Sequence, residues 1–83
     1  MALNYYSARN YNNNRGYSQQ AIGIIQTFAN ARTTGVFDDQ TIKAIYEVQQ
    51  SPLYPFKFEP DGKVGPKTLG LMILEFENVT RMY

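Results

Sequence analysis

The chain has 83 residues and a formal net charge of +1, and it contains neither cysteine nor histidine. This length suits one small domain with a thin core. The charge gives no indication of a nucleic-acid partner, and the absent residue types exclude disulfides and the side chains that most often act as base, nucleophile or zinc ligand.

Residues 1–17 form a polar segment rich in Asn and Tyr. Asn tolerates left-handed backbone and makes local turns, so we expect an extended or turn-rich arm with a short helix near 5–9. The segment "MALNYYSARNYNNNRG" has no apolar stretch flanked by basic residues, so no secretory signal is predicted. The apolar stretch "LGLMIL" is too short to span a bilayer.

Two amphipathic helices are predicted next. Ser18 is a suitable N-cap for the first, in which apolar residues recur at helical spacing to about residue 31. Gly35 interrupts this pattern, and Asp38 is a suitable N-cap for the second helix. That helix should end before Pro52, because a residue that precedes proline disfavours helical backbone.

A loop and a third helix complete the predicted order. The loop "SPLYPFKFEP" covers 51–60 and contains three prolines and three aromatic residues. Gly65 can cap the third helix, Pro66 suits its first position, and an apolar stripe follows from Leu69 to Val79. The prediction is an all-α, three-helix bundle-like domain over 18–83 that follows the polar arm 1–17, because helices of this length need mutual packing.

The turns that lead into the second and third helices resemble each other. "TGVFDDQT" and "DGKVGPKT" align without gaps, and an apolar-Gln pair, ending in Gln26 or Gln49, precedes each turn. This pattern predicts a pseudo-twofold repeated helix-entry turn in which Gly62 has a positive φ. The residues with a predicted structural role are Gly35, Phe37, Asp38, Thr41, Asp61, Gly62, Val64, Gly65 and Thr68.

Three blocks, "GYSQQAIGIIQ", "GVFDDQTIKAIYEVQ" and "DGKVGPKTLGLM", together resemble the peptidoglycan-binding domain attached to cell-wall hydrolases. The similarity covers about residues 16–76. The chain departs from the family pattern at two places. Val48 stands where an aromatic residue is usual, and the connection from Gln49 to Asp61 is longer and more aromatic than usual. The positions that match the pattern are Gly16, Ile22, Ile25, Gln26, Gly35, Phe37, Thr41, Ala44, Ile45, Gln49, Asp61, Gly62, Val64, Gly65, Pro66 and Thr68.

The resemblance implies a non-catalytic module without cofactor or metal that binds the glycan or stem peptide of peptidoglycan and is joined to a catalytic domain. With an initial Met and no secretory signal, the chain is expected to be the N-terminal module of a phage endolysin or an interbacterial lytic effector, delivered to the periplasm or cell wall by lysis or a dedicated secretion system. Neither a membrane nor a nucleic acid is an expected partner. The alternative is a docking module of the same fold that binds a delivery apparatus or a partner catalytic domain.

The predicted ligand surface combines aromatic and basic residues. Rigid aromatic rings can contact sugars or side chains, and lysines beside a helix start can hold an anion. The same rings could instead be core, the lysines could be solvated, and the tyrosines of the arm could either pack on the helices or stack on sugars. Asp38, Asp39 and Asp61 could be imagined as an acid/base pair or a calcium site, but we interpret Asp38 as a helix cap and Asp61 as a turn residue. The candidate ligand-binding residues are Tyr54, Phe56, Phe58, Lys63 and Lys67.

Overall fold

The computed structural model describes residues 3–50, 60–66, 68–70 and 72. It contains α1 (Tyr5–Asn13), α2 (Gln19–Phe28) and α3 (Asp39–Gln50). Residues 66, 68–70 and 72 are also helical, and the rest of the predicted third helix lies outside the described residues. The part of the chain that is described has no strand, so it has the all-α character predicted from the sequence.

The first helix is longer than the short helix expected near residues 5–9. The side chain of Asn4 accepts a hydrogen bond from the backbone N–H of Ser7 and caps α1, which continues to Asn13. Ala8 and Asn12 are both buried, and their spacing of four residues places them on one face of the helix. Residues 5–13 are therefore a packed helix, because burial of this face outweighs the weak helix propensity of its asparagines.

The two predicted caps of α2 and α3 are confirmed. Ser18 Oγ accepts from the N–H of Ala21 at 3.1 Å, and Asp38 Oδ1 accepts from the N–H of Thr41 at 2.9 Å. The first of these helices ends at Phe28, earlier than predicted, and Asn30 then adopts a φ of 60°. Asn is one of the few residues that tolerate this left-handed conformation, so the chain can turn there without glycine.

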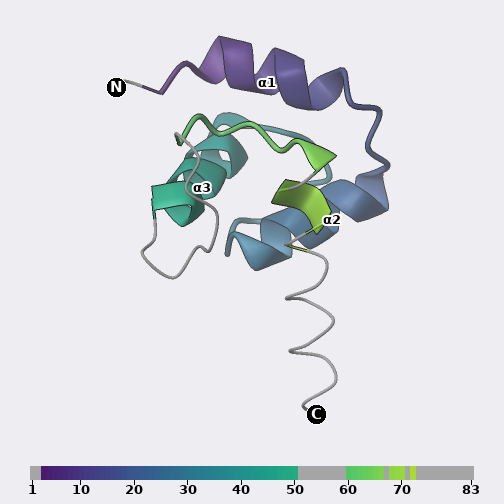
Figure 1. Cartoon of the computed structure of the whole chain (residues 1–83). Helices are drawn as coiled ribbons and strands as arrows, with labels where there is room; N and C mark the ends of the chain where they lie inside the picture. The colour runs from purple at the N-terminus through teal and green to yellow at the C-terminus, as the bar shows by residue number, and fades with distance from the viewer. Residues whose placement is uncertain (1–2, 51–59, 67, 71, 73–83) are drawn as a thin grey trace.

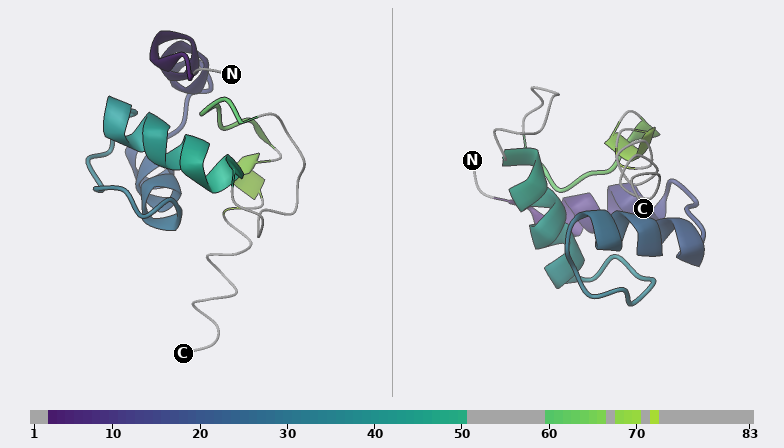
Figure 2. Two further views of the ribbon diagram at one scale, coloured as in Figure 1. Left: turned by 90° about the vertical axis from the view of Figure 1, so that its left-hand side faces the viewer. Right: turned by 90° about the horizontal axis from the view of Figure 1, so that it is seen from below.

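Residues 60–66 occupy the space between α1 and the other two helices. In Figure 1 this segment passes beneath α1 and above α2 and α3, and the left view of Figure 2 shows it again between α1 and α3. The helix α1 therefore does not extend away from the domain, and it covers a segment about 50 residues further along the chain. No helix in the described residues is long and apolar enough to cross a membrane.

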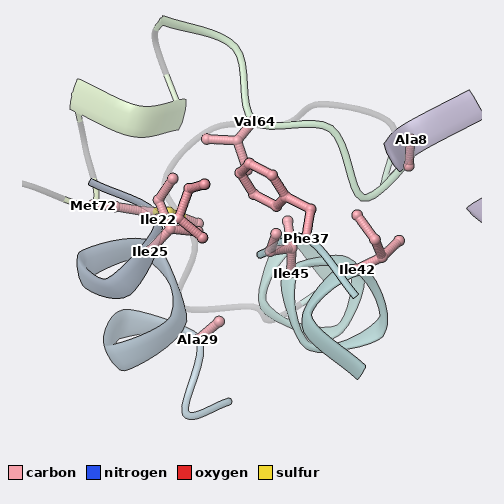
Figure 3. Packing of buried hydrophobic residues seen from close by; sticks show 9 residues of the cluster. All are labelled: Ala8, Ile22, Ile25, Ala29, Phe37, Ile42, Ile45, Val64 and Met72. Carbon is pink, nitrogen blue, oxygen red and sulfur yellow. The ribbon is translucent and has the colours of Figure 1, made fainter. Parts of the chain in front are cut away.

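The hydrophobic core draws on each of these layers. Phe37, which precedes α3, points toward Val64 of the 60–66 segment, and Met72 joins the same cluster as Ile22 and Ile25 of α2 (Figure 3). The core thus joins residues that are distant in sequence, and its buried apolar members are Ala8, Ile22, Ile25, Ala29, Phe37, Ile42, Ile45, Val64 and Met72.

Candidate functional site

The first glycine turn is held by a buried glutamine of α2. Gln26 Oε1 accepts from the N–H of Gly35 at 3.1 Å, and its Nε2 donates to the carbonyl of Val36 at 3.0 Å. The same Nε2 lies 2.8 Å from the hydroxyl of Thr41 in α3. Gln26 is fully buried, so these contacts satisfy its amide and fix the turn relative to both helices.

The second glycine turn is held in the same way by a glutamine of α3. Gln49 Oε1 accepts from the N–H of Gly62 at 2.8 Å and from that of Asp61 at 3.0 Å. Its Nε2 donates to the carbonyl of Lys63 at 3.0 Å. In each turn the glutamine therefore contacts the N–H of the glycine and the carbonyl of the next residue.

Other aligned positions of the two turns also have matching environments. Gly35 and Gly62 have φ values of 80° and 74°, as expected for Gly62. Phe37 and Val64 are buried. Thr41 and Thr68 are buried too, so the threonines of both turns face the interior. The turns differ in span, since Gly35 follows Gln26 by 9 positions in the sequence and Gly62 follows Gln49 by 13.

The aspartates of these turns have local roles. Besides capping α3, Asp38 accepts from the hydroxyl of Thr41 at 2.6 Å. Asp61 Oδ1 accepts from the N–H of Lys63 at 2.9 Å, which is the side-chain turn expected from the sequence. Gly65 lies at the start of the last helical residues, where its carbonyl accepts from the N–H of Leu69 at 2.9 Å.

The second turn has a further attachment to α1 that the sequence analysis missed. Asn12 Nδ2 donates to the carbonyl of Gly62 at 3.0 Å, and Asn12 Oδ1 accepts from the N–H of Val64 at 2.7 Å. The hydroxyl of Tyr17 donates to the carbonyl of Val64. One weak signal could have indicated Asn12, because it lies four residues after Ala8 in a segment with few apolar residues.

The same region brings a basic and aromatic cluster to the surface. Arg15 Cζ lies 4.8 Å from the centre of the Tyr11 ring, and Lys63 Nζ lies 5.6 Å from it. Burial raises the pKa of the neighbouring Tyr17, the charge of Tyr11 raises it further, and Arg15 opposes both effects. We call Tyr11, Arg15 and Lys63 the cationic cluster.

Most of the predicted ligand residues lie beyond the described part of the chain. Tyr54, Phe56, Phe58 and Lys67 are outside the described residues. Lys63 is described and lies beside Tyr11, a residue of the predicted arm. No group of three or more Asp, Glu, His or Cys side chains that could hold a metal ion occurs within the described residues.

Acid is expected to weaken the domain partly through Asp38. The hydrogen bond from the Thr41 hydroxyl is the main cause that lowers the pKa of Asp38, and bonds from the Thr41 N–H and the Thr34 hydroxyl add to it while burial opposes them. A lowered folded pKa means that this stabilisation is complete above the unfolded value of about 3.9 and is lost as the pH falls through the folded value. Urea unfolding of the wild type and Asp38→Asn from about pH 6 to about pH 2 should show a stability gap that narrows in acid. A constant gap would contradict this role.

Comparisons with protein-family models, curated proteins and solved structures found no match to the chain, so the family resemblance depends on the residues quoted above.

Proposed function

We propose that this chain is a non-catalytic peptidoglycan-binding module that holds an attached cell-wall hydrolase against murein. The observation that carries the proposal is the shared construction of the two glycine turns, each held by a buried glutamine. These turns contain the motifs that resemble the family, so the residues that match its pattern also have a consistent physical role in this fold.

The arrangement of the helices as a repeated unit is part of the same proposal. The helices α2 and α3 and a third helix that begins at Pro66 would form a three-helix unit, with α3 shared between two copies of a helix, turn and helix repeat. The second copy has the longer, aromatic connection, in which Gly62 follows Gln49 by 13 positions. The parent protein would be a phage endolysin or an interbacterial lytic effector that acts in the periplasm or cell wall.

The proposed wall-binding surface joins the aromatic loop to the second glycine turn. Tyr54, Phe56 and Phe58 would supply rigid rings, and Lys63 and Lys67 would supply positive charge beside them. Each contact on a shallow surface of a small domain is weak. Dense repeats of the wall and tethering to an enzyme would raise the effective concentration of the module.

The purified chain is expected to sediment with isolated sacculi and to leave them intact. Tyr54→Ala, Phe56→Ala and Lys67→Ala should each reduce the fraction of the chain retained on sacculi while leaving the melting temperature unchanged. The reason is that the proposal places these side chains on the ligand-binding surface and not in the core. The measurements are sacculus retention, thermal unfolding and the turbidity of the wall suspension. Lys43→Ala is the matched control, since Lys43 is an exposed lysine of α3 outside the proposed surface.

Three results would contradict the proposal in different ways. Release of soluble muropeptides by the chain would show that it is catalytic. Loss of stability in step with loss of retention would show that the aromatic rings belong to the core. A wild-type chain that does not sediment with sacculi would favour the alternative, a docking module for a delivery apparatus or partner catalytic domain.

A further inference from the structure

Three elements contribute one side chain each to the cationic cluster. Tyr11 belongs to α1, Arg15 to the turn that follows α1, and Lys63 to the second glycine turn. The guanidinium and the ammonium approach the same ring, at 4.8 and 5.6 Å from its centre. Two positive charges thus contact one ring on the surface of a domain whose net charge is only +1.

These two charges have no acidic partner among the described residues. The ion pair found there joins Arg9 to Asp39 at 2.6 Å, and neither Arg15 nor Lys63 takes part in one. The acidic residue nearest in sequence to Lys63, Asp61, uses Oδ1 to accept from the Lys63 N–H and the Gln49 amide. Two like charges that contact one ring and form no ion pair create a positive potential that favours an anion.

The backbone that carries Tyr11 and Lys63 is held by hydrogen bonds, two of them buried. Gln49 binds the carbonyl of Lys63, and Asp61 binds its N–H, so the backbone of Lys63 is held on both sides. Asn12, the residue after Tyr11, joins α1 to Gly62 and Val64 of the same turn. The backbone positions of Tyr11 and Lys63 are therefore set relative to each other before any ligand arrives, which lowers the entropic cost of binding.

We propose that the cationic cluster is a binding site for an oxyanion, either a carboxylate or a phosphate. The planar guanidinium of Arg15 can donate two hydrogen bonds to such a group, and the Lys63 ammonium supplies a second charge. The Tyr11 ring attracts both cations through its π-face and accepts no conventional hydrogen bond from them, so their N–H groups can donate to a ligand. Tyr11 and Arg15 precede residues 16–76, so this site is not carried over from the family resemblance.

The molecule that would carry the oxyanion is inferred from the proposed function, and this part of the inference rests on it. In a wall-binding module the oxyanion would be a free carboxylate of a stem peptide or a phosphate of a wall polymer. The cluster would then orient the domain on an acidic group next to the glycan. The binding of a small oxyanion in solution does not depend on that assignment.

The site can be tested by titrating the full-length ¹⁵N-labelled chain. The probes are inorganic phosphate and N-acetylalanylalanine, which has a free carboxylate, with its uncharged amide as the control ligand. Saturable shifts of the amide signals of Tyr11, Arg15 and Lys63 are expected with an anionic probe and not with the amide. The anion that saturates at the lower concentration identifies which of the two sources fits the site.

Variants that remove one charge each provide the decisive comparison. Arg15→Gln and Lys63→Gln should each weaken binding about two- to fivefold, the range expected for exposed charges. Lys43→Gln makes the same change in net charge on the exposed face of α3 and should leave the titration unaltered. Linear shifts spread over the surface, or an equal loss in Lys43→Gln, would overturn the site.

Sacculus retention of Arg15→Gln separates this site from the proposed function, because Arg15 belongs to the cationic cluster and not to the proposed wall-binding surface. Reduced retention of folded Arg15→Gln supports the use of the site on the wall. If the wild type and Arg15→Gln sediment equally, wall binding stands and the assignment of this site to the wall fails. If the wild type does not sediment but phosphate still saturates the cluster, the wall-binding function fails and the oxyanion site stands.

Discussion

Gly62→Ala is expected to lower the free energy of unfolding by about 3 kcal/mol, the sum of a strained backbone and a steric clash. Gly62 has a φ of 74°, a conformation that is unfavourable for any residue with a Cβ. A Cβ at this position would lie 2.9 Å from Ile42 Cγ2 and 3.1 Å from Leu3 Cδ1. Leu3 can rotate away, but Ile42 is fully buried in α3 and its Cγ2 is only two bonds from the backbone.

Gly35→Ala is the matched control for that experiment. Its φ of 80° imposes the same backbone strain, but the nearest atom to a new Cβ is Gln19 Cγ at an ordinary 3.7 Å. The expected loss is about 1 kcal/mol, the strain alone. Urea unfolding of both variants measures the difference. Equal losses, or a Gly62→Ala variant as stable as the wild type, would mean that the clash with Ile42 does not restrict the second turn.

Asn12→Ala is expected to cost about 3 kcal/mol of stability. The Asn12 side chain is fully buried and makes hydrogen bonds to the carbonyl of Gly62 and the N–H of Val64. Alanine would leave both backbone groups buried without these partners, and each such loss costs about 1–3 kcal/mol. The gain in helix propensity from Asn to Ala, less than about 1 kcal/mol, is too small to offset this.

Asn10→Ala provides the control for Asn12→Ala because Asn10 lies on the same helix with an exposed side chain. It should be neutral or slightly stabilising, since alanine favours the helix and no tertiary contact is lost. Urea unfolding would measure the stability of both variants from the midpoint of the transition, provided that the dependence of the unfolding free energy on urea concentration is unchanged. If Asn12→Ala unfolded at the same midpoint as Asn10→Ala, α1 would not be attached to the second turn as described.

Gly62→Ala and Asn12→Ala also bear on function, because both act on the segment that carries Lys63. Weakening of the attachment between α1 and the second turn separates the Tyr11 ring from the Lys63 ammonium. Oxyanion binding should therefore fall in Asn12→Ala even under conditions where the chain remains folded. Arg15→Gln, in contrast, should reduce binding with little change in stability, since Arg15 is exposed.

The local sequence alone determined the helix starts and the backbone conformation of the second turn. Ser18 and Asp38 were recognisable as caps because a short polar side chain can reach the free N–H groups of the first helical turn from its own position. Gly62 was recognisable as a positive-φ residue because few other residue types adopt that conformation readily. Such features depend on a few consecutive residues, so the sequence contains all the information that they require.

Only the tertiary structure decided the role of residues 1–17 and the composition of the cationic cluster. The asparagines of this segment favour turns when considered locally, but Asn12 forms its hydrogen bonds with backbone groups 50 and 52 residues away. Lys63 was predicted beside an aromatic loop, and the structure places it at the ring of Tyr11. Contacts of this kind arise from the burial of Ala8 and Val64 in one core, a cooperative effect that no local pattern encodes.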